Sequence, residues 1–236
     1  MNRLKLYYDV LSQPSRVVKI FLLANKIEFE HKVVRLGKFE QKTEEFKKVN
    51  PLQQVPVIDD GGFILRESVA IMRYLCREKD VPIHWYPKES KAQAKVDEYL
   101  EWQHLGTRMH CGLYFRLMWL EPLVTKTAPP AKKVEFYKRN MEQNCDLVEK
   151  FWLADKPFLC GDEITIADLF AAAELEQPKL TGYDVRDGRP FLSAWLERVR
   201  TITSPHYDAV HNEINRIASK YNGQCPALVG KQEANR

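Results

Sequence analysis

The chain has 236 residues, 44% of them hydrophobic and 29% charged, with a formal net charge of +4. This composition is typical of a globular protein with a sizeable core, and no run approaches the ~18 apolar residues of a membrane helix. The basic excess lies in residues 1–80, with 15 Lys and Arg against 11 Asp and Glu. These charges are too interspersed for a nucleic-acid surface. We therefore expect the protein to bind neither nucleic acid nor a membrane.

Cysteine usage and the start of the chain indicate a reducing compartment. The five cysteines are scattered and include no C-x-x-C pair, which argues against a disulfide framework and against a zinc site. Residues 1–8 have the pattern of a strand and lack that of a signal peptide. We therefore expect a cytoplasmic protein without a metal.

Residues 1–80 predict an α/β thioredoxin-like domain with a mixed four-stranded sheet. Segments in which apolar residues recur at every second position alternate with segments in which they recur at helical spacing. Asp59-Asp60-Gly61-Gly62 is a turn-forming cluster typical of a hairpin. The expected elements are strand 4–8, a helix from Pro14, strand 27–34, a short helix 42–48, strands 55–58 and 63–65, and a helix from Glu67 to about Lys79. The order β-α-β-α-β-β-α describes a layer of helices on a sheet.

Residues 81–90 form a proline-punctuated linker, and residues 91–236 predict an all-helical domain. The segment Thr165-Ile166-Ala167-Asp168 fits a capping box, which we interpret as structural. The polar tail 223–236 is a candidate for disorder. Helices are expected over 92–120, ended by Pro122, and over 133–153, 166–175, 191–202 and 207–220.

Ser12-Gln13-Pro14-Ser15 lies where a thioredoxin carries C-x-P-C, at the junction of the first strand and the first helix. Two serines cannot cycle through a disulfide, but a helix start still stabilises an anion such as a thiolate. A hydroxyl donating to a charged sulfur would supply roughly 1.5 to 3 kcal/mol, which suits Ser12 as a thiolate stabiliser. Two alternatives stay open: Ser12 only caps the helix, or Tyr8 is the donor.

Two further segments suggest a peptide ligand. Val55-Pro56 opens a strand, and a cis peptide there would leave the Val55 backbone groups free to pair with an extended chain. Glu67-Ser68 opens a helix, so Ser68 could hold a carboxylate while Glu67 faces an ammonium. An ordinary edge proline and a plain helix cap are the alternatives. A ligand with all these features is γ-Glu-Cys-Gly, glutathione.

The chain resembles a theta-class glutathione transferase over nearly its whole length. The resemblance rests on Leu11-Ser12-Gln13-Pro14-Ser15-Arg16, Val49-Asn50-Pro51-Leu52, Val55-Pro56, Glu67 to Ile71, Trp85-Tyr86-Pro87, Val96 to Leu100 and Trp102-Gln103-His104. It implies a homodimer whose first domain binds glutathione and whose helical domain holds the electrophile. It also implies that Arg108 faces the sulfur, whereas that residue alone would be read as a surface or ion-paired arginine.

The chain departs from the theta pattern in two places. Gln41 and Gln54 stand where theta enzymes often place a histidine and a lysine near the glycine end of glutathione. The amides can hydrogen-bond but bring no charge. The tail also lacks the apolar, tryptophan-bearing segment that covers the site in mammalian members, so the sequence predicts no such lid and resembles an insect-like or other non-mammalian member.

We therefore expect a glutathione transferase acting in detoxification: glutathione serves as cosubstrate, and its thiolate attacks small electrophiles or reduces hydroperoxides. The expected site comprises Ser12 as the catalytic residue, Gln41, Gln54, Val55, Glu67 and Ser68 for glutathione, and Arg108 on the electrophile side. The alternative is a non-catalytic interaction module, because the same fold also serves as a docking domain.

Overall fold

The computed structural model describes residues 3–232. Its N-terminal domain contains a mixed sheet of strand order β2-β1-β3-β4, formed by β1 (Leu4–Tyr8), β2 (Phe29–Val33), β3 (Val57–Asp60) and β4 (Phe63–Leu65). β1 runs parallel to β2 and antiparallel to β3, with Leu6 opposite His31 and Ile58. This topology confirms the predicted fold class of the first domain.

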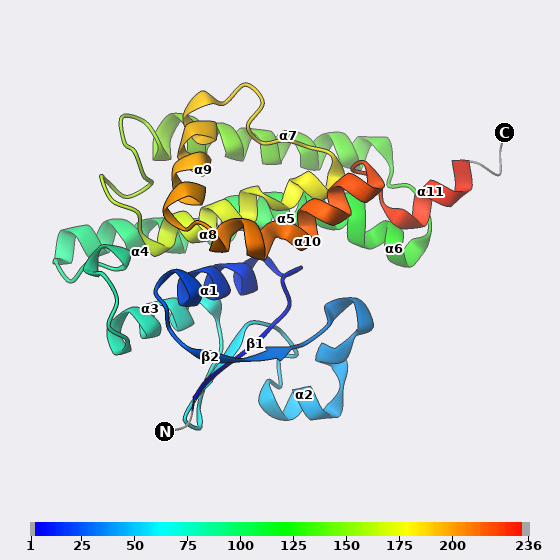
Figure 1. Cartoon of the computed structure of the whole chain (residues 1–236). Helices are drawn as coiled ribbons and strands as arrows, with labels where there is room; N and C mark the ends of the chain where they lie inside the picture. The colour runs from blue at the N-terminus through cyan, green and yellow to red at the C-terminus, as the bar shows by residue number, and fades with distance from the viewer. Residues whose placement is uncertain (1–2, 233–236) are drawn as a thin grey trace.

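Two helices cover one face of the sheet and a third lies on the other side (Figure 1). Helices α1 (Gln13–Ala24) and α3 (Ser68–Glu78) lie between the sheet and the helical domain, and α2 (Glu44–Val49) lies beyond the opposite face. Short 3-10 turns η1 (Leu36–Lys38) and η2 (Glu40–Lys42) lead into α2. α1 is buried along most of its length because its apolar residues meet both the sheet and the second domain.

The hairpin between β3 and β4 turns at two glycines, as the sequence predicts. Gly61 and Gly62 have φ angles of 66° and 100°, values that favour glycine because it lacks a Cβ. The Gly62 N–H donates to Asp59 Oδ1 at 2.7 Å, so the turn closes on its own aspartate.

The linker packs against the first domain through η3 (Ile83–Trp85). The Trp85 indole N–H donates to Asn25 Oδ1 at 2.9 Å, and its ring lies edge-on to Phe21 at 5.5 Å between centroids. Because Trp85 is only 4% exposed, this ring anchors the linker below the helical domain.

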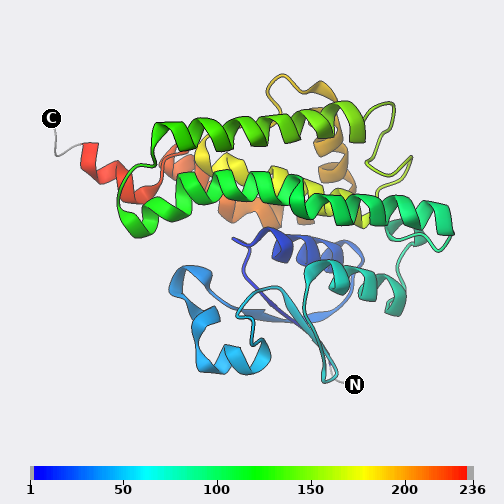
Figure 2. The same ribbon diagram turned by 180° about the vertical axis from the view of Figure 1, so that it is seen from behind.

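The second domain is helical, as predicted, but its helices break where periodicity suggested continuity. The expected helix over 92–120 is instead a bent series of segments, which runs along the near side of the helical domain in Figure 2. The bend falls at Gly106, where an added Cβ would lie 2.7 Å from the Trp102 ring. Pro122 does not end the series, because it occupies the first turn of the next helix, where proline is tolerated. The segments are α4 (Ser90–Leu105), α5 (Thr107–Phe115), the π-helix η4 (Arg116–Leu120) and α6 (Glu121–Thr125).

The centre of this domain is α8 (Ile166–Leu175), in which every residue is buried. Its predicted capping box is confirmed: Asp168 accepts from the Thr165 N–H at 2.8 Å and also from the Trp195 indole at 2.9 Å. The remaining helices pack around or beyond it: α7 (Ala131–Leu147), the π-helix η5 (Val148–Trp152), the 3-10 helix η6 (Gln177–Thr181), α9 (Pro190–Ile202) and α10 (His206–Tyr221).

The tail is a helix over much of its length, which corrects the expectation of disorder for residues 223–232. Helix α11 (Pro226–Gln232) lies beside α6 (Figure 1), and Leu228 joins an apolar cluster with Leu123 and Trp119. The Cys225 thiol donates to the Trp119 carbonyl at 3.4 Å, so the chain is tied down before the helix begins. Residues 233–236 lie outside the described part of the chain. Within that part, no helix is long and apolar enough to cross a membrane.

Candidate active site

A buried aspartate holds the loop that carries Ser12. The Asp9 carboxylate accepts from the Leu11 N–H at 2.9 Å and from the Leu36 N–H at 2.7 Å. The Ser12 N–H donates to the Asp9 carbonyl at 3.0 Å. Ser12 precedes α1 with extended backbone, yet its hydroxyl makes no capping hydrogen bond. The side-chain hydrogen bond of the capping alternative is therefore not formed, although Ser12 is the N-cap residue of α1.

The loop before β3 presents its backbone to the same region. The Val55-Pro56 peptide is cis, which confirms the expectation from sequence. Buried Asn50 braces the loop, since its amide donates to the Gln54 carbonyl at 2.8 Å and its carbonyl accepts from the Leu52 N–H at 3.0 Å. The Gln54-Val55 segment is thus held in a defined shape next to the sheet.

The third part is the start of α3. Glu67 is the N-cap residue with φ 63° and ψ 109°, an unusual conformation for a residue with a side chain, and Ser68 is the first helical residue. Such backbone conformations cost roughly 1–3 kcal/mol and cluster at binding sites. Glu67 is exposed and Ser68 is buried, so the pair offers a solvent-facing carboxylate beside free N–H groups of a helix start.

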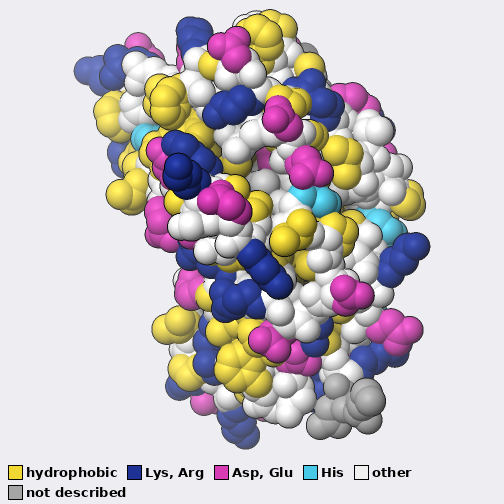
Figure 3. Space-filling model, turned by 90° about the vertical axis from the view of Figure 1, so that its left-hand side faces the viewer, with side chains coloured by type: hydrophobic (Ala, Val, Ile, Leu, Met, Phe, Trp, Pro, Cys, Tyr) yellow, Lys and Arg dark blue, Asp and Glu magenta, His cyan; other side chains and the backbone are white. Residues whose placement is uncertain are grey.

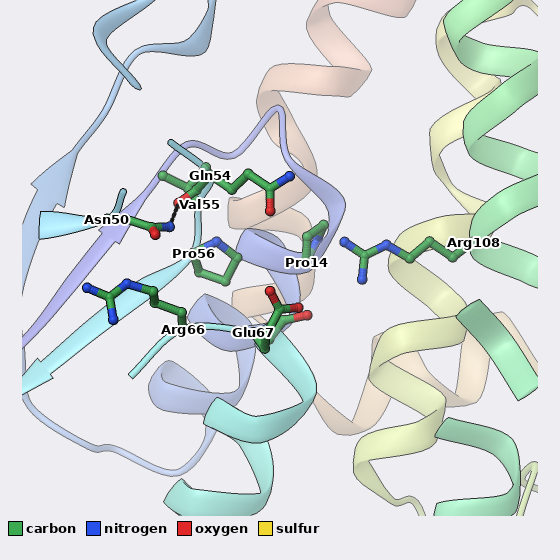
Figure 4. A pocket seen from close by; sticks show the side chains of 9 residues that line it. Pro14, Asn50, Gln54, Val55, Pro56, Arg66, Glu67 and Arg108 are labelled. Atoms are coloured by element: carbon green, nitrogen blue, oxygen red, sulfur yellow. Dashed lines mark hydrogen bonds between the residues drawn. The ribbon is translucent and has the colours of Figure 1, made fainter. Parts of the chain in front are cut away.

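These segments enclose one polar pocket between the two domains (Figure 4). The Arg108 side chain extends from α5 of the helical domain toward Pro14 and Glu67. A cationic group thereby faces the helix starts that suit anions. The pocket is lined by Pro14, Asn50, Gln54, Val55, Pro56, Arg66, Glu67, Ser68 and Arg108.

Arg108 also faces a buried acid. Its Nε lies 3.7 Å from Oε1 of Glu174 on α8, whose side chain is 2% exposed. Burial raises the pKa of Glu174 to about 7, and the charges of Arg108 and Arg16 act in the opposite direction. Arg108 is thus ion-paired as well as pocket-lining.

Of the residues expected from sequence, the pocket brings together Gln54, Val55, Glu67, Ser68 and Arg108. Ser12 is not among the lining residues, although Pro14 in the same turn is. Gln41 lies in η2, where its buried Oε1 has no hydrogen-bond partner. An unpaired buried acceptor is costly, so an incoming donor would be favoured there.

Tyr8 is engaged elsewhere. Its hydroxyl lies 3.1 Å from His31 Nδ1 and accepts from Lys19 Nζ at 3.1 Å. The Lys19 ammonium also lies 4.5 Å from the centroid of the Tyr8 ring. The phenol therefore has partners on α1 and β2, whereas the Ser12 hydroxyl makes no capping bond.

Four lining residues were not among the expected site residues: Pro14, Asn50, Pro56 and Arg66. Arg66 donates to the Val49 carbonyl at 2.7 Å and so links the segment before α3 to the last residue of α2. The signal for Asn50 was its place before Pro51, which is typical of a turn with an amide hydrogen-bonded to its own backbone. Arg66 carried no local signal, because its partner lies 17 residues away.

An apolar wall adjoins the Ser12 loop. Leu11 packs with Phe115, Trp119, Leu123 and Tyr221 in a cluster that also contains α11 side chains. The described α11 side chains, at 226–229, are not among the residues that line the polar pocket. On the face shown in Figure 3, basic and acidic side chains are interspersed over the surface, without a field of one sign.

The chain matches two family models. Residues 3–77 match the glutathione S-transferase N-terminal domain, and residues 116–202 match its C-terminal domain. Bovine (Bos taurus) glutathione S-transferase theta-1 is 39% identical over 227 residues, covering 95% of this chain and 92% of the relative. Human (Homo sapiens) glutathione S-transferase theta-2 is 42% identical over 196 residues, covering 83% and 80%.

Solved structures agree with these relatives. Human glutathione-S-transferase T1-1 in its apo form superposes with a TM-score of 0.88 at 38% identity, covering 92% of this chain and 91% of that one. Human glutathione transferase theta-2, in complex with glutathione and an unknown ligand, gives a TM-score of 0.88 at 38% identity, covering 95% and 93%. With both domains and most of the sequence matched, the chain belongs to the glutathione S-transferase family and its similar relatives are of the theta class.

Proposed function

We propose that this chain transfers glutathione to small electrophiles, with Ser12 holding the sulfur as a thiolate. The observation that carries the proposal is the polar pocket where Val55, Glu67, Ser68 and Arg108 meet beside the start of α1. Val55, Glu67 and Ser68 match parts of a γ-Glu-Cys-Gly tripeptide, and Arg108 faces the electrophile side. The theta-class transferases that cover most of the chain disfavour the non-catalytic module.

The two ends of glutathione would bind to different elements. The γ-glutamyl carboxylate fits the N–H groups at the start of α3 and the Ser68 hydroxyl, and its ammonium fits Glu67. The cysteinyl backbone pairs with Val55 as an added strand. The glycine end reaches Gln41 and Gln54, which supply neutral amides. The unpaired Oε1 of Gln41 would accept a hydrogen bond from the glycine N–H, since the glycine carboxylate offers no donor.

The sulfur would lie at the start of α1. A free thiol with a pKa of about 8.5 is only about 3% ionised at pH 7, and each unit of lowering takes about 1.4 kcal/mol. A donated hydrogen bond from Ser12 and the positive end of α1 act in this direction. The thiolate then attacks the electrophile, and the leaving group departs with the electron pair of the broken bond.

Arg108 would act on the electrophile side. Its guanidinium lies across the pocket from the α1 start, where it would stabilise negative charge that grows on a leaving group. The apolar wall of Leu11 and Phe115 supplies a surface for the non-polar part of a substrate. Hydroperoxides are a second substrate class: the thiolate attacks a peroxide oxygen, the O–O bond breaks with release of the alcohol, and a second glutathione converts the resulting sulfenic acid to glutathione disulfide and water.

The wider setting is also part of the proposal. We infer a detoxifying enzyme of the cytoplasm that acts as a homodimer, with glutathione as cosubstrate and no metal. The absence of C-x-x-C pairs and the scattered free cysteines suit a reducing compartment. Sedimentation of the purified chain would test the dimer.

The experiment is glutathione binding by calorimetry, followed by turnover of an alkyl halide and a hydroperoxide. Arg108→Ala should lower kcat/KM about 10-fold while glutathione affinity stays within a few-fold. Arg216→Ala is the matched control, because this exposed arginine pairs with Glu213 on α10. No glutathione binding, or equal turnover by both variants, would refute the assignment.

A further inference from the structure

We propose that Glu174 is a positioning residue for Arg108, one that holds the guanidinium over the pocket during turnover. The inference rests on the proposed function, because it assumes that Arg108 acts on the electrophile. Glu174 lies on α8 and does not line the pocket. It would therefore act only through Arg108.

The burial of the two partners is unequal. Glu174 is 2% exposed in its side chain and Arg108 is 36% exposed, with Arg108 Nε 3.7 Å from Glu174 Oε1. This distance exceeds a hydrogen bond, so the contact is an ion pair that fixes a direction but leaves the guanidinium N–H groups free for a ligand. The second carboxylate oxygen, Oε2, is buried without a hydrogen-bond partner.

An ionised carboxylate in this position needs cations. Every residue of α8 is buried, and an unpaired carboxylate in such surroundings would take up a proton. Arg16 is buried completely and interacts with Glu174 electrostatically. Its Nη2, however, donates to the Ala173 carbonyl at 2.9 Å and to Gln177 Oε1 at 2.7 Å. Arg108 is thus the cation that the Glu174 carboxylate can orient directly.

Arg16 connects this pair to the loop of Ser12. It donates to the Val10 carbonyl at 2.9 Å, two residues before Ser12. One buried charge array therefore runs from the proposed sulfur site through Arg16 and Glu174 to Arg108. A change in the charge of Glu174 would move Arg108 more than Arg16, because Arg108 is more exposed and has fewer hydrogen bonds to hold it. The effect would therefore be on the electrophile side.

The pH dependence follows from the groups around the carboxyl. In the described chain, Arg16 from α1 and Arg108 and Cys111 from α5 face Glu174. The pKa of the Cys111 thiol is raised well above its usual value by contact with Cys145 and by burial, so it stays neutral. With its own pKa at about 7, Glu174 is charged and holds Arg108 in the alkaline range, and it loses that hold on acidification.

The first measurement is a double-mutant cycle of Glu174→Gln and Arg108→Ala. We expect E174Q to lower kcat/KM for the electrophile about fivefold at pH 8, with glutathione affinity within twofold. The double variant should be no slower than R108A, because Glu174 acts through Arg108. Glu213→Gln, which removes the same charge from an exposed pair with Arg216, is the control and should leave turnover unchanged.

A second measurement follows pH. The ratio of wild-type to E174Q kcat/KM should rise from near one at about pH 5.5 to its full value above about pH 8, because Glu174 becomes charged over this range. Ionisation of the thiol affects wild type and E174Q equally, so it cancels in the ratio. A ratio independent of pH, or additive losses in the cycle, would overturn the inference.

The third measurement does not depend on turnover or on a folded E174Q. Carbon-13 NMR, with Glu174 assigned through bonds, should show its carboxyl pKa rising in R108A relative to wild type. An unmoved titration overturns the pair. If the pKa of Glu174 changes in R108A but R108A keeps full turnover, the electrophile-side role of Arg108 is wrong, and so is the positioning role of Glu174. If R108A is slow and E174Q is not, only the inference about Glu174 fails.

Discussion

Replacement of Ser12 by alanine should change the chemistry of the bound sulfur with little effect on folding. The Ser12 hydroxyl makes no capping hydrogen bond, and the backbone N–H that donates to the Asp9 carbonyl is retained in alanine. Loss of a helix cap typically costs about 1 kcal/mol. Because no cap is lost here, we expect the free energy of unfolding to change by less than about 0.5 kcal/mol.

The effect on the thiol follows from one hydrogen bond to a charged sulfur. Such a bond is worth roughly 1.5 to 3 kcal/mol, which corresponds to a rise of about one to two units in the thiol pKa and a ~10- to 100-fold lower kcat. Glutathione affinity should stay within a few-fold. Val55, Glu67 and Ser68, which would hold the rest of the tripeptide, are unchanged in the variant.

The assay is ultraviolet titration of the enzyme-bound thiolate, alongside kcat at a fixed pH. Ser15→Ala is the matched control, since Ser15 is completely buried in the same helix and its Oγ has no hydrogen-bond partner. It should leave the thiol pKa and kcat unchanged. It should not lower stability, because an unpaired buried hydroxyl is removed.

An unchanged thiol pKa in Ser12→Ala would refute the assignment. If Tyr8→Phe then shifted the pKa, the role would pass to the phenol, although that hydroxyl already contacts His31 and Lys19. If neither variant shifted it, the helix start of α1 alone would have to account for ionisation of the thiol.

Three further predictions concern stability and binding. Gly223→Ala should lower the free energy of unfolding by at least ~2 kcal/mol, because Gly223 has φ 71° and a Cβ there would lie 2.3 Å from the Cα of Gly182. A urea midpoint equal to that of the wild type would contradict this prediction. Burial lowers the pKa of His211 to about 4, so the unfolded chain gains a proton first on acidification. Stability should therefore fall by roughly 3 kcal/mol between about pH 6.5 and 4, and less in His211→Phe; parallel urea curves for both proteins across this range would count against it. The glutathione KM should depend only weakly on ionic strength, because Gln41 and Gln54 bring no charge to the glycine carboxylate; a steep rise with salt would mean that a nearby lysine reaches it.

Local sequence signals predicted most of the first domain and several residues that line the pocket. Ser12-Gln13-Pro14, Val55-Pro56 and Glu67-Ser68 each lie at a junction between elements, where turn and helix-start chemistry depends on adjacent residues. The same holds for the Thr165–Asp168 capping box, which the structure confirms. Such features are determined within a few residues of chain, so the sequence by itself was sufficient.

Tertiary structure decided what depends on contacts between distant segments. Helical periodicity could not show the break at Gly106, where the Trp102 ring lies close to the backbone. It also could not show helix α11, which packs on Leu123 of α6. The pairing of Arg108 with Glu174 was equally invisible, because it requires α5 and α8 to be placed side by side with both side chains directed at one point. Side-chain direction and burial are properties of the packed fold, and they alone determine whether an arginine is a solvated surface charge or the cation above a pocket.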